Sequence, residues 1–246
     1  FSGGRYKHLL KISAWVGVPL VAVGVILLIV DLGNQLFFWH LMVRFLPVSA
    51  MSIGTWLLTI WAILAVVLII LWLAEDDVPV FRIVGFLVPL AKPLAWINLV
   101  VSVLLITYTG VLLSATSLEL WATVLLPVLF VVSAISTGWA ASLLVAAVLG
   151  REIPHEVGQA GAILAVLEVV ALVAFLLAVP SGVLTTGPLS IWFWIGVVVI
   201  GLLVPFALEL WSQRARAKTL LVVASALCVL LGGIVLRAVV VIGGQI

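Results

Sequence analysis

Seven long apolar runs constrain this chain more than any other feature of its sequence. A membrane-spanning helix needs about 20 predominantly apolar residues. Backbone polar groups in hydrocarbon must be hydrogen-bonded within their own segment, so each run is predicted to be a helix rather than a barrel strand. We therefore expect an all-α, polytopic transmembrane helix bundle. The runs lie at approximately 9–31, 49–74, 93–115, 120–149, 157–180, 189–211 and 219–243.

The composition agrees with a lipid environment. Hydrophobic residues make up 66% of the chain, and the mean hydropathy is +1.50. A soluble domain must present a polar surface to water, so the expected solvent is the lipid bilayer. The net charge of +2 gives no reason to expect a nucleic-acid partner. We treat residues 1–246 as a single transmembrane domain, and the lone cysteine, Cys228, excludes a disulfide within the chain.

Lysine and arginine are distributed very unequally between the two sides of the predicted bundle. The side of the N-terminus carries nine of them, whereas the opposite side carries only Arg44. Basic residues are enriched in cytoplasmic loops, so the N-terminal side is predicted to be cytoplasmic and the C-terminus to lie outside. The nine are Arg5, Lys7, Lys11, Arg82, Lys92, Arg151, Arg214, Arg216 and Lys218.

Polar residues gather at one edge, in the segment 31–56 between the first two runs. Charged residues are only 8% of the sequence, so such a gathering indicates a site. The segment reads DLGNQLFFWHLMVRFLPVSAMSIGTW. Its polar residues include Asp31, Asn34, His40, Arg44, Ser49 and Ser52.

This segment resembles the DLG…FWHLL…SPMSWGAW region of NrfD- and PsrC-type membrane subunits. Asn34 and Gln35 stand where that family usually has Arg-Pro. Three further blocks resemble the same family in the same order: YTGVLLSAT at 108–116, LLPVLFVVSAISTGWAASLL at 125–144 and GGIVLRAVVVIGGQ at 232–245.

The resemblance implies a membrane anchor subunit of a respiratory oxidoreductase, of the polysulfide- or thiosulfate-reductase kind. Such a subunit binds menaquinone or another quinone near the outer face and holds no redox centre of its own. Its implied partners, docked on the outer face, are an iron–sulfur electron-transfer subunit and a catalytic molybdopterin subunit. The implied location is the cytoplasmic membrane of a bacterium or archaeon during anaerobic respiration. Polysulfide-reductase-type members have eight helices, so we expect one further helix before Phe1.

A quinone site needs an apolar slot, a donor to each carbonyl oxygen and a group that exchanges protons. Tyr108 corresponds to the family's tyrosine donor, and Ser52, Trp56 and Arg237 complete the predicted quinone-binding set. Tyr108 and Arg237 lie roughly 12 Å and 9 Å inside the outer ends of their runs. The alternatives are an interfacial aromatic for Tyr108 and a structural ion pair for Arg237, with Asp31 as the expected partner.

Proton transfer is assigned to Asp31, His40 and Glu168. Glu168 lies near the middle of its run, where a lone carboxylate is costly. It is expected to relay protons, with Ser136 and Thr137 at a similar depth. The alternatives are an interfacial role for His40 and a protonated, hydrogen-bonded carboxyl for Glu168. Glu209 is expected to be interfacial.

The sequence predicts no haem, iron–sulfur cluster, metal or nucleotide in this chain. Haem b is usually held by histidines inside the spans, and all three histidines lie at or beyond helix ends. The rival interpretation is a secondary transporter or ion-conducting protein with Asp31, Glu168 and Arg237 as coupling residues.

Overall fold

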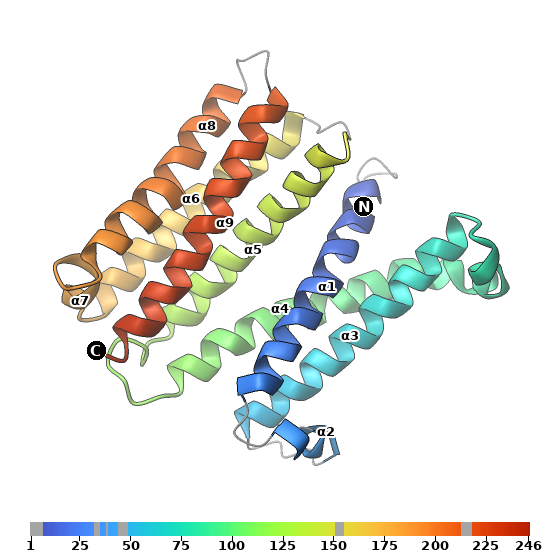
Figure 1. Cartoon of the computed structure of the whole chain (residues 1–246), viewed down its shortest axis with the longest axis horizontal. Coiled ribbons are helices and arrows are strands. Elements are labelled where there is room, and N and C mark those ends of the chain that lie inside the picture. Colours follow the sequence, from blue (N-terminus) through green and yellow to red (C-terminus); the bar gives the residue numbers. More distant parts are fainter. Residues whose placement is uncertain (1–6, 32–34, 38, 44–48, 151–154, 213–217) are drawn as a thin grey trace. The chain divides into compact units, whose positions relative to one another are not determined.

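The computed structural model describes residues 7–31, 35–37, 39–43, 49–150, 155–212 and 218–246. Every regular element in these ranges is a helix, and seven helices are long and apolar enough to cross a membrane. The prediction of an all-α transmembrane bundle is therefore confirmed. The protein separates into two compact units, 1–108 and 109–246, which are described separately below (Figure 1). A single transmembrane domain stays a prediction.

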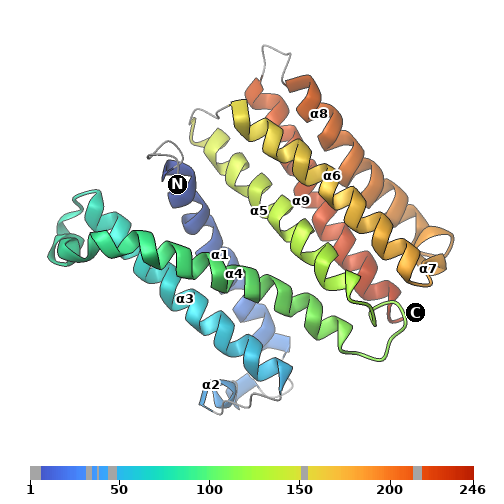
Figure 2. The same ribbon diagram turned by 180° about the vertical axis from the view of Figure 1, so that it is seen from behind.

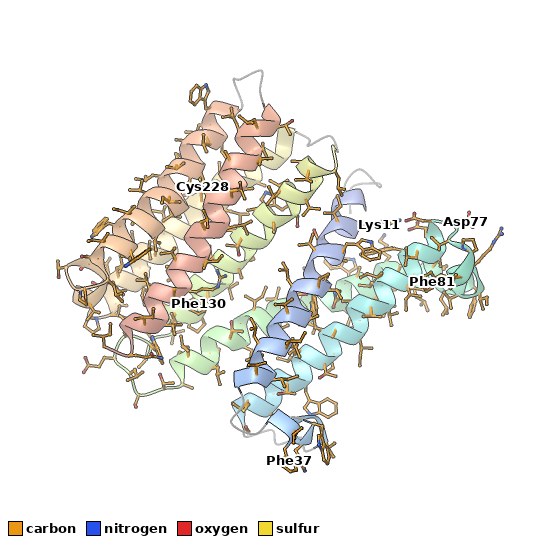
Figure 3. The ribbon with its side chains drawn as sticks, viewed as in Figure 1. Lys11, Phe37, Asp77, Phe81, Phe130 and Cys228 are labelled. Atoms are coloured by element: carbon orange, nitrogen blue, oxygen red, sulfur yellow. The ribbon has the colours of Figure 1, made fainter. Side chains whose placement is uncertain are left out.

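The first unit is built on α1 (Lys7–Asp31), α3 (Ala50–Glu75) and most of α4 (Ala91–Ser114). The start of α1 is fixed to the end of α3, because Lys11 Nζ donates to Asp76 Oδ1 at 2.6 Å and lies 3.7 Å from Glu75 Oε2. Lys11 and the neighbouring turn are labelled in Figure 3. These contacts make α1 and α3 antiparallel. Two short helices, η1 (Gln35–Phe37) and α2 (His40–Val43), lie between them.

A part-buried hydrogen bond joins α3 to α4. The Trp61 indole Nε1–H donates to Ser102 Oγ at 2.8 Å, and that hydroxyl donates to Asn98 O at 2.7 Å. Hydrogen bonds of this kind between membrane helices help to fix the position of one helix against the other.

The segment between α3 and α4 is η2 (Pro79–Leu90), a 3₁₀-helix. A 3₁₀-helix has three residues per turn, so Val80, Ile83 and Phe86 share one face. All three are at least 76% exposed. Their exposed apolar face suits the lipid boundary.

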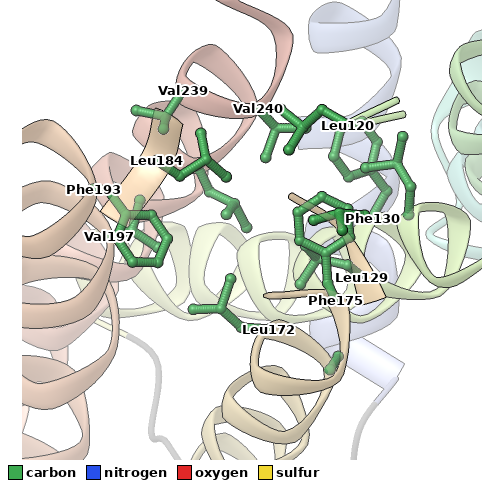
Figure 4. Packing of buried hydrophobic residues seen from close by; sticks show 14 of the residues in the cluster. Leu120, Leu129, Phe130, Leu172, Phe175, Leu184, Phe193, Val197, Val239 and Val240 are labelled. Carbon is green, nitrogen blue, oxygen red and sulfur yellow. The ribbon is translucent and has the colours of Figure 1, made fainter. Parts of the chain in front are cut away.

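The second unit is a bundle of long helices that lie side by side in both views (Figures 1 and 2). Its elements are α5 (Leu125–Val148), α6 (His155–Ala178), α7 (Gly182–Thr185), η3 (Trp192–Leu203), α8 (Val204–Ser212) and α9 (Lys218–Gly243). Phe175, Phe193, Leu129 and Leu184 meet in its main apolar cluster (Figure 4).

The predicted run boundaries agree with the helices to within a few residues, with one larger difference at the start of α5. The run begins at 120, whereas α5 begins at Leu125. The intervening residues form a turn, which is held to α9 because Trp121 Nε1 donates to Val240 O at 2.8 Å. Hydropathy cannot distinguish this buried turn from a helix, because both are apolar.

The sequence predicts one regular helix across 189–211, but the structure divides it into the π-helical η3 and the α-helical α8. Pro205 has no N–H, so the usual bonding ladder cannot continue through it. The Val204 N–H instead bonds to Val199 O, five residues back. The π-helix also packs tightly on α9, where a Cβ added at Gly201 would lie 2.8 Å from Gly232 Cα. π-helical turns frequently adjoin functional sites.

Candidate functional site

Tyr108, the predicted quinone donor, packs in the first unit against Gly54 of α3. A Cβ added at Gly54 would overlap the phenol ring of Tyr108. Only glycine therefore lets the ring approach the backbone of α3 this closely. Within the described part of the protein, the half-buried Tyr108 hydroxyl makes no hydrogen bond. This hydroxyl is available to a bound molecule.

Ser52 and Trp56 belong to a different face of α3. They are one turn apart and share a face, whereas Gly54 is about 160–200° away from them on a helix of 3.6 residues per turn. Ser52 is buried and Trp56 is partly exposed. The structure therefore does not bring Ser52 and Trp56 onto the side of α3 that meets Tyr108. Their role in binding a quinone stays a prediction.

His40 is the first residue of α2 and is held by local contacts. Its Nδ1 lies 3.2 Å from Phe37 O, and its ring stacks on Trp39 with centroids 3.8 Å apart. Both neighbours are exposed aromatics. The predicted proton transfer by His40 is not tested by this arrangement.

Several residues of the 31–56 segment lie outside the described part. Asp31 is the last residue of α1, but its side chain is not described, and Asn34 and Arg44 lie in undescribed ranges. The expected pairing of Asp31 with Arg237 therefore stays a prediction. Ser49 is described, and its hydroxyl caps α3 by accepting from the Ser52 N–H.

Arg237 lies in the second unit, on the side of α9 that meets α5. Its Nη1 donates to Gly233 O, one turn earlier, at 2.9 Å. A Cβ at Gly233 would overlap Thr137 of α5, so the two helices are in contact at this level. The Glu168 carboxylate lies near enough for its charge to act on the Arg237 guanidinium. A guanidinium at this depth needs such compensation.

Glu168 also lines a cavity of about 40 Å³ inside the second unit. The cavity is lined by residues of α5, α6, α8, α9 and the end of η3. Ser136, one of the two residues expected at the depth of Glu168, lines it too, whereas the other, Thr137, is not among the lining residues. Its polar lining residues are Ser136, Trp139, Glu168, Glu209 and Ser225.

Glu209 lines the same cavity. The sequence predicts an interfacial residue because Glu209 lies near the end of its run, and that depth stays a prediction. The structure adds that the carboxylate faces the cavity and accepts a hydrogen bond from Ser225 Oγ at 3.3 Å. It packs on Gly161 of α6, where an added Cβ would lie 2.6 Å from Glu209 Oε1. The seven-residue spacing between Gly161 and Glu168 is the sequence signal that could have indicated a shared polar face.

The described residues contain no group of three or more His, Cys, Asp or Glu side chains positioned to hold a metal ion. What the structure does bring together is a phenol beside a helix backbone in one unit, and two carboxyl groups around a cavity in the other.

These features define a polytopic helical membrane protein with polar groups inside its apolar helices. The family described as "Polysulphide reductase, NrfD" matches residues 2–246. The sequence is 32% identical to "Protein NrfD" of Escherichia coli (strain K12), over 100% of its own length and 85% of that protein. It is also 32% identical to the C subunit of polysulfide reductase from Wolinella succinogenes, over 98% of its own length and 83% of that subunit. The protein belongs to the NrfD family, and it is an integral membrane subunit of the kind that anchors a respiratory oxidoreductase complex.

Proposed function

We propose that this protein is the quinone-binding anchor of a multi-subunit respiratory oxidoreductase. It binds menaquinone or another quinone near the outer face of a bacterial or archaeal cytoplasmic membrane. It exchanges electrons with an iron–sulfur subunit, which in turn serves a molybdopterin catalytic subunit. Membership of the NrfD family supports this role, because one relative is named as a subunit of polysulfide reductase.

The observation that carries the proposal is the Tyr108 hydroxyl. It is a donor in an apolar, half-buried setting, and it makes no hydrogen bond among the described residues. A quinone carbonyl is an acceptor that gains a proton on reduction, so it suits such a phenol. The ring of Tyr108 is fixed in place because it fits the space left by Gly54. A fixed donor positions a ligand better than a mobile one.

The proposed partners dock on the outer face over the segment 31–56. This segment carries Asp31 and His40, which we propose exchange protons with the outside as the quinone is reduced or the quinol oxidised. Glu168 is proposed to carry protons within the second unit, where it lies inside the bundle rather than at its surface.

The proposal is tested with Tyr108→Phe in the intact complex. The ring volume is preserved, so the subunits should remain assembled. Loss of one hydrogen bond, about 0.5–1.5 kcal/mol, should lower quinone-linked turnover roughly two- to tenfold. Turnover with a redox dye that feeds the partner subunits directly should not change. The matched control is Tyr6→Phe, the same change in the only other tyrosine.

Two results would contradict the proposal. Equal losses with quinone and with dye would mean that Tyr108 serves assembly. Isolation of the protein from membranes as a homo-oligomer, without iron–sulfur or molybdopterin subunits, would favour the transporter interpretation instead.

A further inference from the structure

Three of the polar side chains that line the cavity make no hydrogen bond to the described residues. Glu168 is 6% exposed and Ser136 is 7% exposed, and neither makes a hydrogen bond to any residue in the described ranges. The Trp139 indole Nε1–H is also buried without a partner among these residues. A buried polar group left unsatisfied costs about 1–3 kcal/mol. The Trp139 donor, with the Glu168 carboxyl and the Ser136 hydroxyl on the same cavity, indicates a ligand.

The size and chemistry of the cavity suit water. Its occupant must accept from the Ser136 and Trp139 donors and donate to the Glu168 carboxylate, and water does both. A water molecule needs roughly 10–15 Å³, so a cavity of about 40 Å³ has room for about two or three. A metal cation suits the site less well, because it could not accept from these donors and would be repelled by the charge of Arg237.

A second carboxyl group, that of Glu209, also lines the cavity. Glu209 packs on Gly161, and Gly161 and Glu168 are seven residues apart on one face of α6. Their Cα atoms are therefore roughly 10 Å apart along the helix axis. Helical side chains lean toward the N-terminus, so the Glu168 side chain extends toward the level of Gly161. Both carboxyl groups line the same cavity, so water molecules in it can contact both.

We propose that water in this cavity joins Glu168 to Glu209, making the two carboxyl groups one proton-sharing site inside the membrane. A proton leaves the O–H of one carboxyl for a bridging water, and that water releases a proton to the other carboxylate. No other bond changes, and no redox partner is needed. Ser225 donates a hydrogen bond to Glu209, and the Arg237 guanidinium lies near enough to Glu168 for their charges to interact. The proposal deepens the proton role suggested above for Glu168, and it rests on that role.

Hydroxyl-radical footprinting tests for the water directly, without quinone turnover. X-ray pulses delivered to the intact protein in lipid nanodiscs convert water to radicals that oxidise adjacent side chains. Mass spectrometry should find oxidised Trp139, carrying ¹⁸O when labelled water is supplied. Trp121 is the matched control, because it is a buried indole that lines the apolar cluster and not the cavity. Unoxidised Trp139 in the unsubstituted protein would overturn the proposal.

Filling the cavity should prevent the oxidation of Trp139. Ala165→Leu places a larger side chain in the lining, so Trp139 oxidation should be lost, whereas Val166→Leu on the exposed face of α6 should leave it unchanged. Ala226→Val serves if Ala165→Leu does not assemble. Oxidation that persists in the filled variants, or that disappears when sodium ions are added, would contradict a water site.

Proton sharing has its own measurement. In infrared spectra of the same samples, the carboxyl band of Glu209 is identified as the band that Glu209→Gln removes. Glu168→Gln should shift this band, because the bridging water loses one of its two carboxyl partners. Glu119→Gln, in an exposed loop, should shift nothing. A Glu209 band that does not move in Glu168→Gln would show two independent carboxyl groups. Failure of the quinone proposal would leave all of these results unchanged.

Discussion

At the scale of single residues, the candidate quinone donor depends on the absence of a side chain. Tyr108 can be found from the family resemblance, but its counterpart Gly54 is one of 20 glycines, and nothing in the sequence sets it apart. The structure shows why glycine is needed there: any Cβ would overlap the phenol. The identity of a packing partner is a property of the tertiary structure.

Gly54→Ala should therefore disturb Tyr108. Alanine gains about 0.5–1 kcal/mol of helix propensity over glycine, but overpacking costs typically about 1–3 kcal/mol. We expect lower thermal stability and lower quinone-linked turnover, because the phenol must move. Gly24→Ala in α1 is the control, since nothing lies within 4 Å of its added Cβ. A Gly54→Ala protein as active and as stable as the Gly24→Ala protein would show that the ring adapts freely.

At the scale of elements, the membrane helices could be predicted well and their contacts poorly. Length and hydropathy determine which segments cross a bilayer, because unsatisfied backbone groups exclude alternatives. They do not determine helix rotation. Ser52 and Trp56 are predicted beside Tyr108 because one is polar, the other is aromatic, and both are near the outer edge. The side of α3 that meets Tyr108 instead carries Gly54. Likewise, Glu209 is near the end of its run but points inward, toward Gly161.

The Trp61–Ser102 bond offers a test of the α3–α4 contact. Ser102→Ala leaves the indole N–H without its acceptor at 2.8 Å. We expect a loss of about 0.6–2 kcal/mol of stability, the range measured for hydrogen bonds between membrane helices. Denaturant titration of the purified protein measures this loss. Ser114→Ala removes only an exposed bond to Val111 O within α4, so it should have little effect. Equal stability of the two variants would mean that the Trp61–Ser102 bond contributes nothing.

At the scale of the whole molecule, orientation comes from charge and not from the fold. Nine of the ten basic residues counted at the membrane edges lie on the side of the N-terminus, which predicts that this side is cytoplasmic. Cysteine labelling of intact cells tests the prediction in a Cys228→Ser background. An impermeant reagent should modify Ser117→Cys, between α4 and α5, and should not modify Ala215→Cys. Labelling of the second variant alone would reverse the orientation and the proposed position of the quinone site together.

Coupling between quinone chemistry and proton movement across the bilayer is also a property of the whole molecule. Glutamine resembles glutamate in size and hydrogen bonding but cannot exchange a proton. Glu168→Gln should therefore preserve folding, subunit docking and dye-linked turnover. If Glu168 carries protons from the cytoplasmic side, the substitution should lower proton uptake from that side during quinone turnover, measured as pH changes in proteoliposomes. Gln245→Ala, near the C-terminus and outside the cavity, is the control and should leave proton uptake unchanged.

The competing arrangement makes a different prediction. A quinone at the outer face can trade protons with the outside through Asp31 and His40, and Glu168 then contributes only to the structure of the second unit. In that case Glu168→Gln would change neither the rate nor the proton stoichiometry. Water could still join Glu168 to Glu209, but the pair would be a closed site rather than part of a pathway. Footprinting reports whether water is present in the cavity, and proton counting reports whether that water takes part in proton transfer across the membrane. An unaltered proton stoichiometry in Glu168→Gln would identify an electroneutral quinone anchor.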